Sequence, residues 1–374
     1  MSLSLVLMFA QVAPPVPPAP PVIVSVPQSP WRPGERALVS WMPGEVRCAG
    51  AVVQGAMVRR PLGTLEFGVQ RAPNPVTYRF SIDGAGRPLS IARQEGATPL
   101  TGPDIGPALA ASRFAGGSPQ QECSVTYAAR VWSMETAPVE DLVSYTISPT
   151  GSPLPREGWA RIRAAGTCTD APRPRVLLRA FPDFAKVAGT PGVKDWSLIG
   201  FDTDAGGVPV RMRTLHTTGN AALDAAAAKA VGESRFTGGA RTDCLYPYWK
   251  AAEKLPAPPI PDEEALRPEG SVCASKPEWN SRPVLVFPEP WRRRAIEGWA
   301  VVSYDVAPWG AVGNARVLAS QPSEDFGRQA MSIVHSGRVA ASAQGATGCV
   351  ETVRFVMGRG DSRPVDDEVG FFDG

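Results

Sequence analysis

The sequence has few histidines, little net charge and no long apolar run. Only two histidines, His216 and His335, occur among 374 residues, which excludes a polyhistidine metal site. The net charge of +2 gives no field that would attract nucleic acid or anionic lipid. A largely apolar stretch at residues 3–10 is far too short for a bilayer, which needs about 20 residues. We therefore expect no nucleic-acid partner and no transmembrane helix in this chain.

The signatures of catalysis are also missing from the sequence. The serines form no nucleophile elbow, and neither histidine has an evident carboxylate or nucleophile partner. The cysteines include no Cys-x-x-Cys motif of the redox type. Four aspartates could be paired acids or metal ligands, but they stand beside glycine and proline, which favours turn chemistry. They are Asp83, Asp202, Asp204 and Asp305. We expect no catalytic residue, no metal and no cofactor, and hence a protein that is not an enzyme.

The sequence does contain three cysteine pairs with an almost constant spacing. The pairs are Cys48 and Cys123, Cys168 and Cys244, and Cys273 and Cys349, each about 75 residues apart. A long spacing that recurs in this way indicates a triplicated domain. Six cysteines allow 15 connectivities, so one disulfide per copy is inferred from the periodicity alone. Such disulfides would place the chain in an oxidising compartment and contribute about 2–4 kcal/mol each.

The chain divides into six segments on this basis. Residues 1–13 are a possible secretory signal peptide, although no Lys or Arg precedes the apolar run, and the alternative is a disordered tail. A proline-rich spacer follows at 14–29. We expect module 1 at 30–135, module 2 at 136–255, module 3 at 256–360 and an acidic tail at 361–374.

Each module repeats one order of local signals between its cysteines. Two alternating apolar runs flank Asp, Gly and Pro turn residues and predict a β-hairpin, at 76–89, 197–210 and 300–312. A short helix should follow, capped by Asn220 in module 2 and by Ser323 in module 3. The version in module 1, residues 104–114, is shorter and is interrupted by Gly106 and Pro107. A last strand then carries the second cysteine.

A further helix is expected before the hairpin in two modules. Phe181-Pro182 and Phe287-Pro288 each predict a short helical stretch, because proline suits a first helical turn. The second stretch should stop near Gly298. The order helix, strand, strand, helix, strand predicts an α+β fold of three tandem small modules. Each module would be a three-stranded antiparallel sheet with helices on one face and one disulfide.

The third copy resembles the TonB C-terminal domain family. The resemblance is an ordered pattern over about 75 residues, with no single diagnostic position. Module 2 matches this pattern more loosely, and module 1 only through the hairpin, the second helix and the last strand. The pattern in module 3 consists of Phe287, Pro288, Ala295, Gly298, Val301, Tyr304, Val306, Gly310, Val312, Val317, Phe326, Ala330 and Phe355.

The resemblance implies a periplasmic binding protein, secreted across the inner membrane, with no bond-making chemistry. Members of the family bind short extended peptides, in particular the energy-coupling segment of outer-membrane receptors, by adding a strand to an exposed sheet edge. The corresponding edge here is Val350, Glu351, Thr352, Val353, Arg354 and Phe355. Alternatives are a structural scaffold, or an energy transducer whose membrane anchor is encoded upstream. A neighbouring module or linker could also cover the edge.

Overall fold

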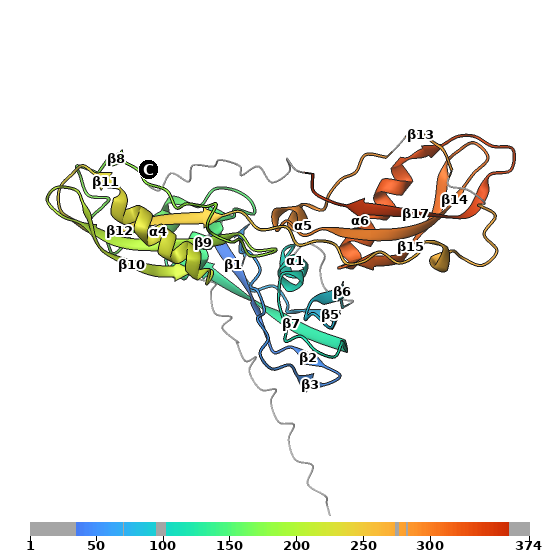
Figure 1. Ribbon diagram of the computed structural model, residues 1–374, viewed down its shortest axis with the longest axis horizontal. Coiled ribbons are helices and arrows are strands. Elements are labelled where there is room, and N and C mark those ends of the chain that lie inside the picture. Colours follow the sequence, from blue (N-terminus) through green and yellow to red (C-terminus); the bar gives the residue numbers. More distant parts are fainter. Residues whose placement is uncertain (1–34, 70, 95–101, 274–276, 282, 359–374) are drawn as a thin grey trace, which may run out of the picture.

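The computed structural model describes residues 35–69, 71–94, 102–273, 277–281 and 283–358. The protein is mixed α+β, with several antiparallel sheets and few helices (Figure 1). The predicted signal peptide, proline-rich spacer and acidic tail lie outside the described residues. Within the ranges given above, no helix is long and apolar enough to cross a membrane.

Module 3 contains a three-stranded sheet in the order β15-β14-β17, with α6 packed on one face (Figure 1). The predicted cap of α6 is confirmed, because Ser323 Oγ accepts a hydrogen bond from Asp325 N at 3.2 Å. The elements are α5 (Glu289–Arg293), β14 (Gly298–Val306), β15 (Val312–Gln321), α6 (Glu324–Ser336) and β17 (Ala346–Phe355), and β13 (Trp279–Ser281) pairs with β16 (Arg338–Val339).

Module 2 has the same arrangement, with a sheet in the order β10-β9-β12. The predicted cap of α4 is also confirmed, since the Asn220 side chain accepts from Leu223 N at 3.1 Å. The elements are β9 (Asp195–Thr203), β10 (Pro209–Thr217), α4 (Ala221–Glu233) and β12 (Arg241–Lys250), and β8 (Val176–Leu178) pairs with β11 (Arg235–Phe236).

Module 1 departs from the expected three strands, because its hairpin belongs to a seven-stranded sheet. Its last strand is longer than those of the other modules, which leaves room for additional neighbours along it. The elements at the predicted hairpin, helix and last strand are β5 (Val76–Ile82), β6 (Pro88–Arg93), α1 (Ile105–Ala110) and β7 (Gln120–Ser133). The added strands are β1 (Arg36–Pro43), β2 (Arg47–Cys48), β3 (Ala51–Val52) and β4 (Thr64–Phe67).

Three helix predictions need correction. The structure has turns and no helix at 181–188, where the Tyr248 hydroxyl and the Lys250 ammonium bind the carbonyls of residues 180 and 184. Helix α5 ends at Arg293, well before Gly298, because Ala295 adopts a left-handed φ of 52°, which a helix cannot continue through. Residues 106 and 107 do not interrupt α1, since they lie in its first turn. The N–H groups of that turn have no partner within the helix, so a proline there removes no helical hydrogen bond.

A close backbone contact recurs in all three modules, where the hairpin turn meets the segment after the helix. The glycines are Gly86, Gly207 and Gly310, and their partners are Phe114, Phe236 and Val339. Each glycine has a positive φ, and a methyl group on it would lie 1.9–2.1 Å from the partner's carbonyl oxygen. Each partner's N–H donates to the glycine carbonyl at 3.0 Å. Only glycine fits such a contact, and its recurrence indicates one shared local architecture.

The modules pack against one another through apolar cores. Ile91, Ile105 and Leu109 of module 1 belong to one cluster with Trp291 and Phe326 of module 3. A second cluster lies between β1 and β9 and is filled by α2 (Val139–Ile147) and α3 (Arg156–Ile162). Module 3 therefore shares buried surface with module 1, and its sheet is not an isolated body.

Candidate functional site

Strand β17, which holds the predicted binding residues 350–355, is an edge strand of its sheet. It pairs antiparallel with β14, from Gly298 opposite Phe355 to Tyr304 opposite Cys349. Among the residues that the structure describes, no strand pairs with its outer side. The structure thus places the predicted residues along a sheet edge, and their binding to a peptide stays a prediction.

Side chains of β17 alternate between two buried faces. Val353 and Phe355 lie in the core beneath α6, where the rings of Phe355 and Phe326 are 5.2 Å apart. Val350 packs on the opposite face with Trp299. Because both faces contribute to cores, the strand is held firmly while its outer backbone groups face away from the sheet.

The linker, which is the first part of module 3 at residues 256–272, covers the sheet face opposite α6. Trp299 Nε1 donates to the carbonyl of Pro258 at 2.8 Å, and Ile260 and Leu266 pack against the same face. Leu266 belongs to a 3₁₀ turn, Glu264–Leu266. The Thr352 hydroxyl binds the carboxylate of Glu263. The linker therefore lies over the face of the sheet. The alternative stated above was that it covers the edge of β17.

Among the described residues, the linker bonds to the backbone edge of the strand at the start of β17. Val272 N donates to the carbonyl of Thr347 at 3.1 Å, and the Cys273–Cys349 disulfide follows. The three predicted disulfides are all present: Cys48–Cys123, Cys168–Cys244 and Cys273–Cys349. Each one ties the incoming segment of a module to the beginning of its last strand.

In module 1 the equivalent edge is occupied by the chain itself. Strand β2 pairs with β7 at Cys48 opposite Cys123, and β1 pairs from Pro43 opposite Tyr127 onward. Between these strands, Gly44 N donates to the carbonyl of Thr126 at 2.8 Å. Thr126, three residues after the module's second cysteine, therefore directs its carbonyl to the outer side.

In module 2 the equivalent edge carries a proline. Pro247 also lies three residues after the module's second cysteine and stands opposite Leu198 of β9. Proline has no N–H and is tolerated in a strand where the missing donor faces outward. The outer edge of β12 thus lacks a central donor, which is a common way to protect an exposed edge from pairing. The corresponding residue of β17 is Thr352, which keeps its N–H.

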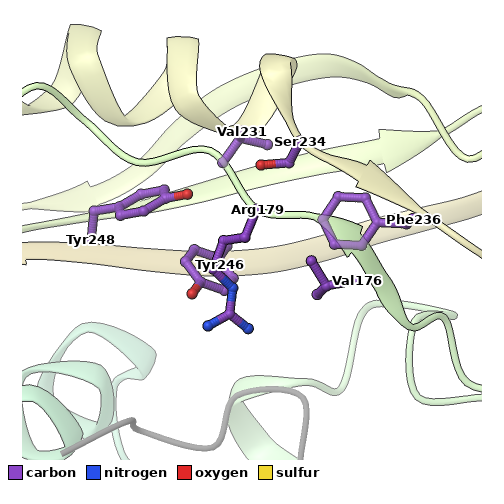
Figure 2. Close-up of a pocket in the computed structure, with 7 residues that line it drawn as sticks. All are labelled: Val176, Arg179, Val231, Ser234, Phe236, Tyr246 and Tyr248. Atoms are coloured by element: carbon purple, nitrogen blue, oxygen red, sulfur yellow. The ribbon is translucent and has the colours of Figure 1, made fainter. Parts of the chain in front are cut away.

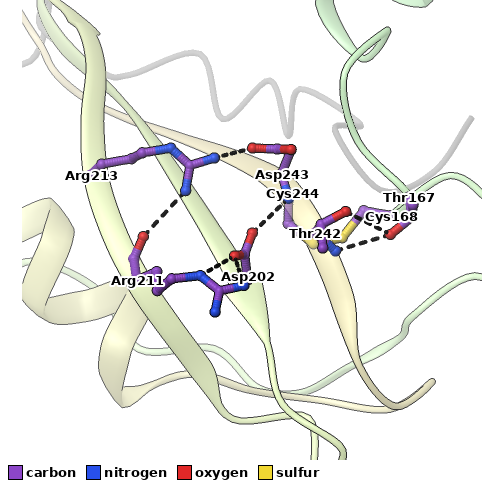
Figure 3. Close-up of polar contacts among 8 residues, drawn as sticks. All are labelled: Thr167, Cys168, Asp202, Arg211, Arg213, Thr242, Asp243 and Cys244. Carbon is purple, nitrogen blue, oxygen red and sulfur yellow. Dashed lines mark hydrogen bonds and ion pairs between the residues drawn. A yellow bond between two sulfur atoms is a disulfide. The ribbon is translucent and has the colours of Figure 1, made fainter.

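The start of β12 is held by a polar network around Asp202 (Figure 3). Asp202 Oδ1 accepts from Asp243 N at 2.7 Å, Asp202 Oδ2 accepts from Arg211 Nε at 2.6 Å, and Arg213 pairs with Asp243. On the other side, Thr167 N donates to the carbonyl of Thr242 at 3.0 Å. These bonds position the bulge that precedes Cys244.

The turn interpretation holds for two of the four aspartates and is wrong for the others. Asp83 Oδ1 and Asp204 Oδ1 accept backbone N–H groups two and four residues ahead, as turn residues do. Asp202 and Asp305 lie within strands and reach across to the last strand. Asp305 Oδ1 accepts from Gly348 N at 2.8 Å. Sequence reasoning missed this role because the contact spans about 40 residues of chain.

A small pocket in module 2 was not anticipated from the sequence (Figure 2). Arg179 lies at it, with its guanidinium carbon 5.4 Å from the centre of the Tyr246 ring. The Tyr248 hydroxyl already donates to the carbonyl of Ala180 at 2.6 Å, so the pocket's polar groups are largely engaged. It is lined by Val176, Arg179, Val231, Ser234, Phe236, Tyr246 and Tyr248.

The two histidines lie on different elements of different modules. His335 lies exposed near the end of α6, and His216 is half-buried in β10. No group of three or more His, Cys, Asp or Glu side chains that could hold a metal ion occurs in the part of the chain that the structure covers.

Comparisons with known proteins point to module 3. Residues 283–357 match the family model of the Gram-negative bacterial TonB protein C-terminal. The TonB protein of Klebsiella pneumoniae is 30% identical over 117 residues, which are 28% of this chain and 48% of that protein. The chain therefore spans about half the length of this curated relative. Together the two matches support a TonB C-terminal domain, and the family model places it at residues 283–357, the part of the chain that contains β17.

Proposed function

We propose that this chain is a periplasmic, non-enzymatic protein that binds an extended peptide along the outer edge of β17. The observation that carries the proposal is the difference among three equivalent edges. That of β7 is filled by β1 and β2, and that of β12 is interrupted by Pro247. In the described ranges, the edge of β17 has neither a paired strand nor a proline. An edge of this kind is a template for strand addition.

The backbone groups that would bind the peptide follow from the ladder. In an antiparallel strand the N–H and C=O of one residue point to the same side, and successive residues alternate. Since the carbonyl of Thr126 faces outward in module 1, the equivalent Thr352 faces outward in module 3. By alternation Val350 and Arg354 do so as well. These three residues would make the main-chain hydrogen bonds to an added strand.

The partner that fits best is a segment of an outer-membrane receptor. This rests on the similarity of residues 283–357 to the TonB C-terminal family. Three disulfides support an oxidising compartment such as the periplasm, because disulfides persist in such an environment. On this view modules 1 and 2 are divergent copies of the same domain, whose edges are closed to strand addition.

A scaffold role is the second candidate, and the shared core of modules 1 and 3 favours it. An energy transducer is a third, supported by the similarity to a protein TonB. Upstream in-frame codons for about 20 apolar residues would favour the transducer. In contrast, a scaffold would show no peptide binding at β17.

Hydrogen exchange on the full chain tests the proposal. Peptides from the energy-coupling segments of outer-membrane receptors would be added to the oxidised protein. Amide exchange at residues 350–355 should slow in a saturable manner, because outward N–H groups become bonded. Exchange along β12, whose edge carries Pro247, should stay unchanged and serves as the internal control. Unchanged exchange along β17 with every peptide would contradict the proposal.

A further inference from the structure

Module 2 presents an exposed surface that is both basic and apolar, which we call the arginine ledge. It comprises the exposed side chains of Arg173, Arg175, Leu177, Leu178 and Phe181, together with the half-buried Arg179. Residues 172–181 contain three arginines and no acidic residue. Leu177, Leu178 and Phe181 are 68%, 57% and 62% exposed. Large apolar side chains this open, interleaved with cations, are typical of an interaction surface.

Backbone hydrogen bonds hold the ledge in place, and its arginines lie at the surface. Arg175 N donates to the Thr237 hydroxyl at 2.9 Å, and β8 pairs with β11. Asp183, the next acidic residue along the chain, is paired with Lys186 at 2.9 Å. The guanidinium of Arg179 rests over the Tyr246 ring at the pocket of Figure 2. The surface is therefore preformed for an acidic partner with apolar side chains.

We propose that the acidic tail, residues 361–374, docks on the arginine ledge of its own chain. The tail combines the two properties that the ledge complements. Asp366, Asp367, Glu368 and Asp373 carry negative charge, and Phe371 and Phe372 are large and apolar. Residues 361–374 contain five acidic residues and one basic residue, Arg363. The carboxylates of the tail would pair with the arginines of the ledge. The two phenylalanines of the tail would pack on the exposed leucines of the ledge, which removes apolar surface from water.

The end of β17 lies close enough for the tail to reach the ledge. The carbonyl of Met357 accepts from Lys254 Nζ at 3.2 Å. Lys254 follows β12 by four residues, and Lys250 Nζ donates to the carbonyl of Phe184 at 2.8 Å, three residues from Phe181. The 16 residues after Gly358 span about 50 Å when extended. This length is enough to follow the contacts just described, from the end of β17 to the ledge of module 2.

Charge also opposes the competing position, in which the tail folds back along the edge of β17. Glu351 lies on that strand, and Glu263 binds the hydroxyl of Thr352 beside it, so two carboxylates stand against one cation of β17, Arg354. An acidic segment placed there would meet carboxylates of its own sign. Docking on the ledge instead carries the tail toward module 2 and away from residues 350–355. The inference stands on the ledge and the tail alone, and it does not require that β17 binds a peptide.

Photo-cross-linking of the full chain tests the docking. With p-benzoylphenylalanine in place of Phe371, cross-links within the same molecule should map to residues 172–181. Reversing the ledge charges, with Arg173→Glu, Arg175→Glu and Arg179→Glu together, should lower their yield by about tenfold, since the pairs become repulsive. Adding Asp366→Lys, Asp367→Lys and Glu368→Lys to that variant should restore the yield. The Arg71→Glu variant, which changes an exposed arginine of module 1, is the control and should not alter it.

Other outcomes would overturn the inference. Cross-links to residues 350–355 would show that the tail covers the β17 edge, and cross-links between two molecules would show a partner in trans. A yield that charge reversal leaves unchanged would remove the electrostatic basis. Peptide binding at β17 is measured separately by hydrogen exchange. Either proposal, tail docking or peptide binding, can therefore be refuted while the other stands.

Discussion

At the scale of single residues, two aspartates anchor the last strands of modules 2 and 3. Asp202 and Asp305 each accept the N–H of the bulge residue before the second cysteine, at 2.7 and 2.8 Å. Burial raises the pKa of Asp202, but the hydrogen bonds from Asp243 N–H and Arg211 outweigh it, so the pKa is below its ordinary value of 3.8. The carboxylate is therefore more favourable in the folded chain than in the unfolded one.

Replacing Asp202 by Asn should reveal this contribution. A carboxyl group with a lowered folded-state pKa stabilises the fold above its unfolded pKa, and this stabilisation is lost as pH falls through the folded pKa. We expect Asp202→Asn to lower the free energy of unfolding by about 1–3 kcal/mol at neutral pH. The difference from the parent should shrink below the ordinary value of 3.8. Denaturant unfolding across pH measures it, with Asp204→Asn as the turn control. A difference independent of pH would contradict this account.

At the scale of elements, a tight glycine contact links each hairpin turn to the segment after the helix. For Gly207, whose φ is 76°, an added methyl group would lie 1.9 Å from the carbonyl oxygen of Phe236. Gly239 has a similar φ of 74° but no atom within 4 Å of that position. The two glycines thus share a backbone conformation and differ in the contact.

This pair separates the contact from backbone strain. Gly239→Ala should cost about 1–2 kcal/mol of unfolding free energy, which is the price of a left-handed φ for a residue with a Cβ. Gly207→Ala carries the same strain and the overlap with Phe236, so we expect a loss larger by about 1–3 kcal/mol. Thermal or denaturant unfolding of both variants measures the difference. Equal losses would mean that the turn moves away freely, and the contact would then not organise the module.

Much of this level of structure could be predicted from the sequence, because the signals are local. Asn220 and Ser323 cap their helices as expected, and the three hairpins occur where alternation and turn residues predicted them. The short helix expected after Pro182 does not form. Only a few residues separate Pro182 from Gly189, and the carbonyl of Phe184 among them binds the Lys250 side chain of β12. The addition of β1 to β7 depends on pairing over about 90 residues, for which the local pattern carries no signal.

At the scale of the whole molecule, a buried ion pair joins the modules. Arg294 donates to both carboxylate oxygens of Asp104 at 2.7 and 2.6 Å and to the carbonyl of Gly192 at 3.3 Å. Asp104 also accepts from Leu62 N at 2.6 Å. Both charged side chains are almost fully buried. Residues of modules 1, 2 and 3 thus meet at one charged contact, which sequence periodicity within single modules could not indicate.

Removing one partner of this pair should destabilise the whole assembly. Arg294→Ala leaves the Asp104 charge buried without its cation, so we expect a loss of about 3–5 kcal/mol of unfolding free energy. Arg292→Ala breaks an exposed pair with Glu289 and should cost less than about 1 kcal/mol. Calorimetry of the oxidised protein distinguishes them. Equal, small effects would show that the modules are held together by apolar packing alone.

The central claim is that the outer backbone edge of β17 is the binding surface, and the affinity of a Thr352→Pro variant tests it most directly. This change gives β17 the proline that β12 carries naturally at Pro247, removing one outward N–H without touching the ladder to β14. Thr352→Val is the matched control, since it removes the hydroxyl contact with Glu263 and keeps the N–H. With a receptor-derived peptide that binds the parent chain, we expect proline to weaken affinity by about tenfold or more and valine to leave it nearly unchanged. Equal affinity of the proline variant and the parent would contradict the account.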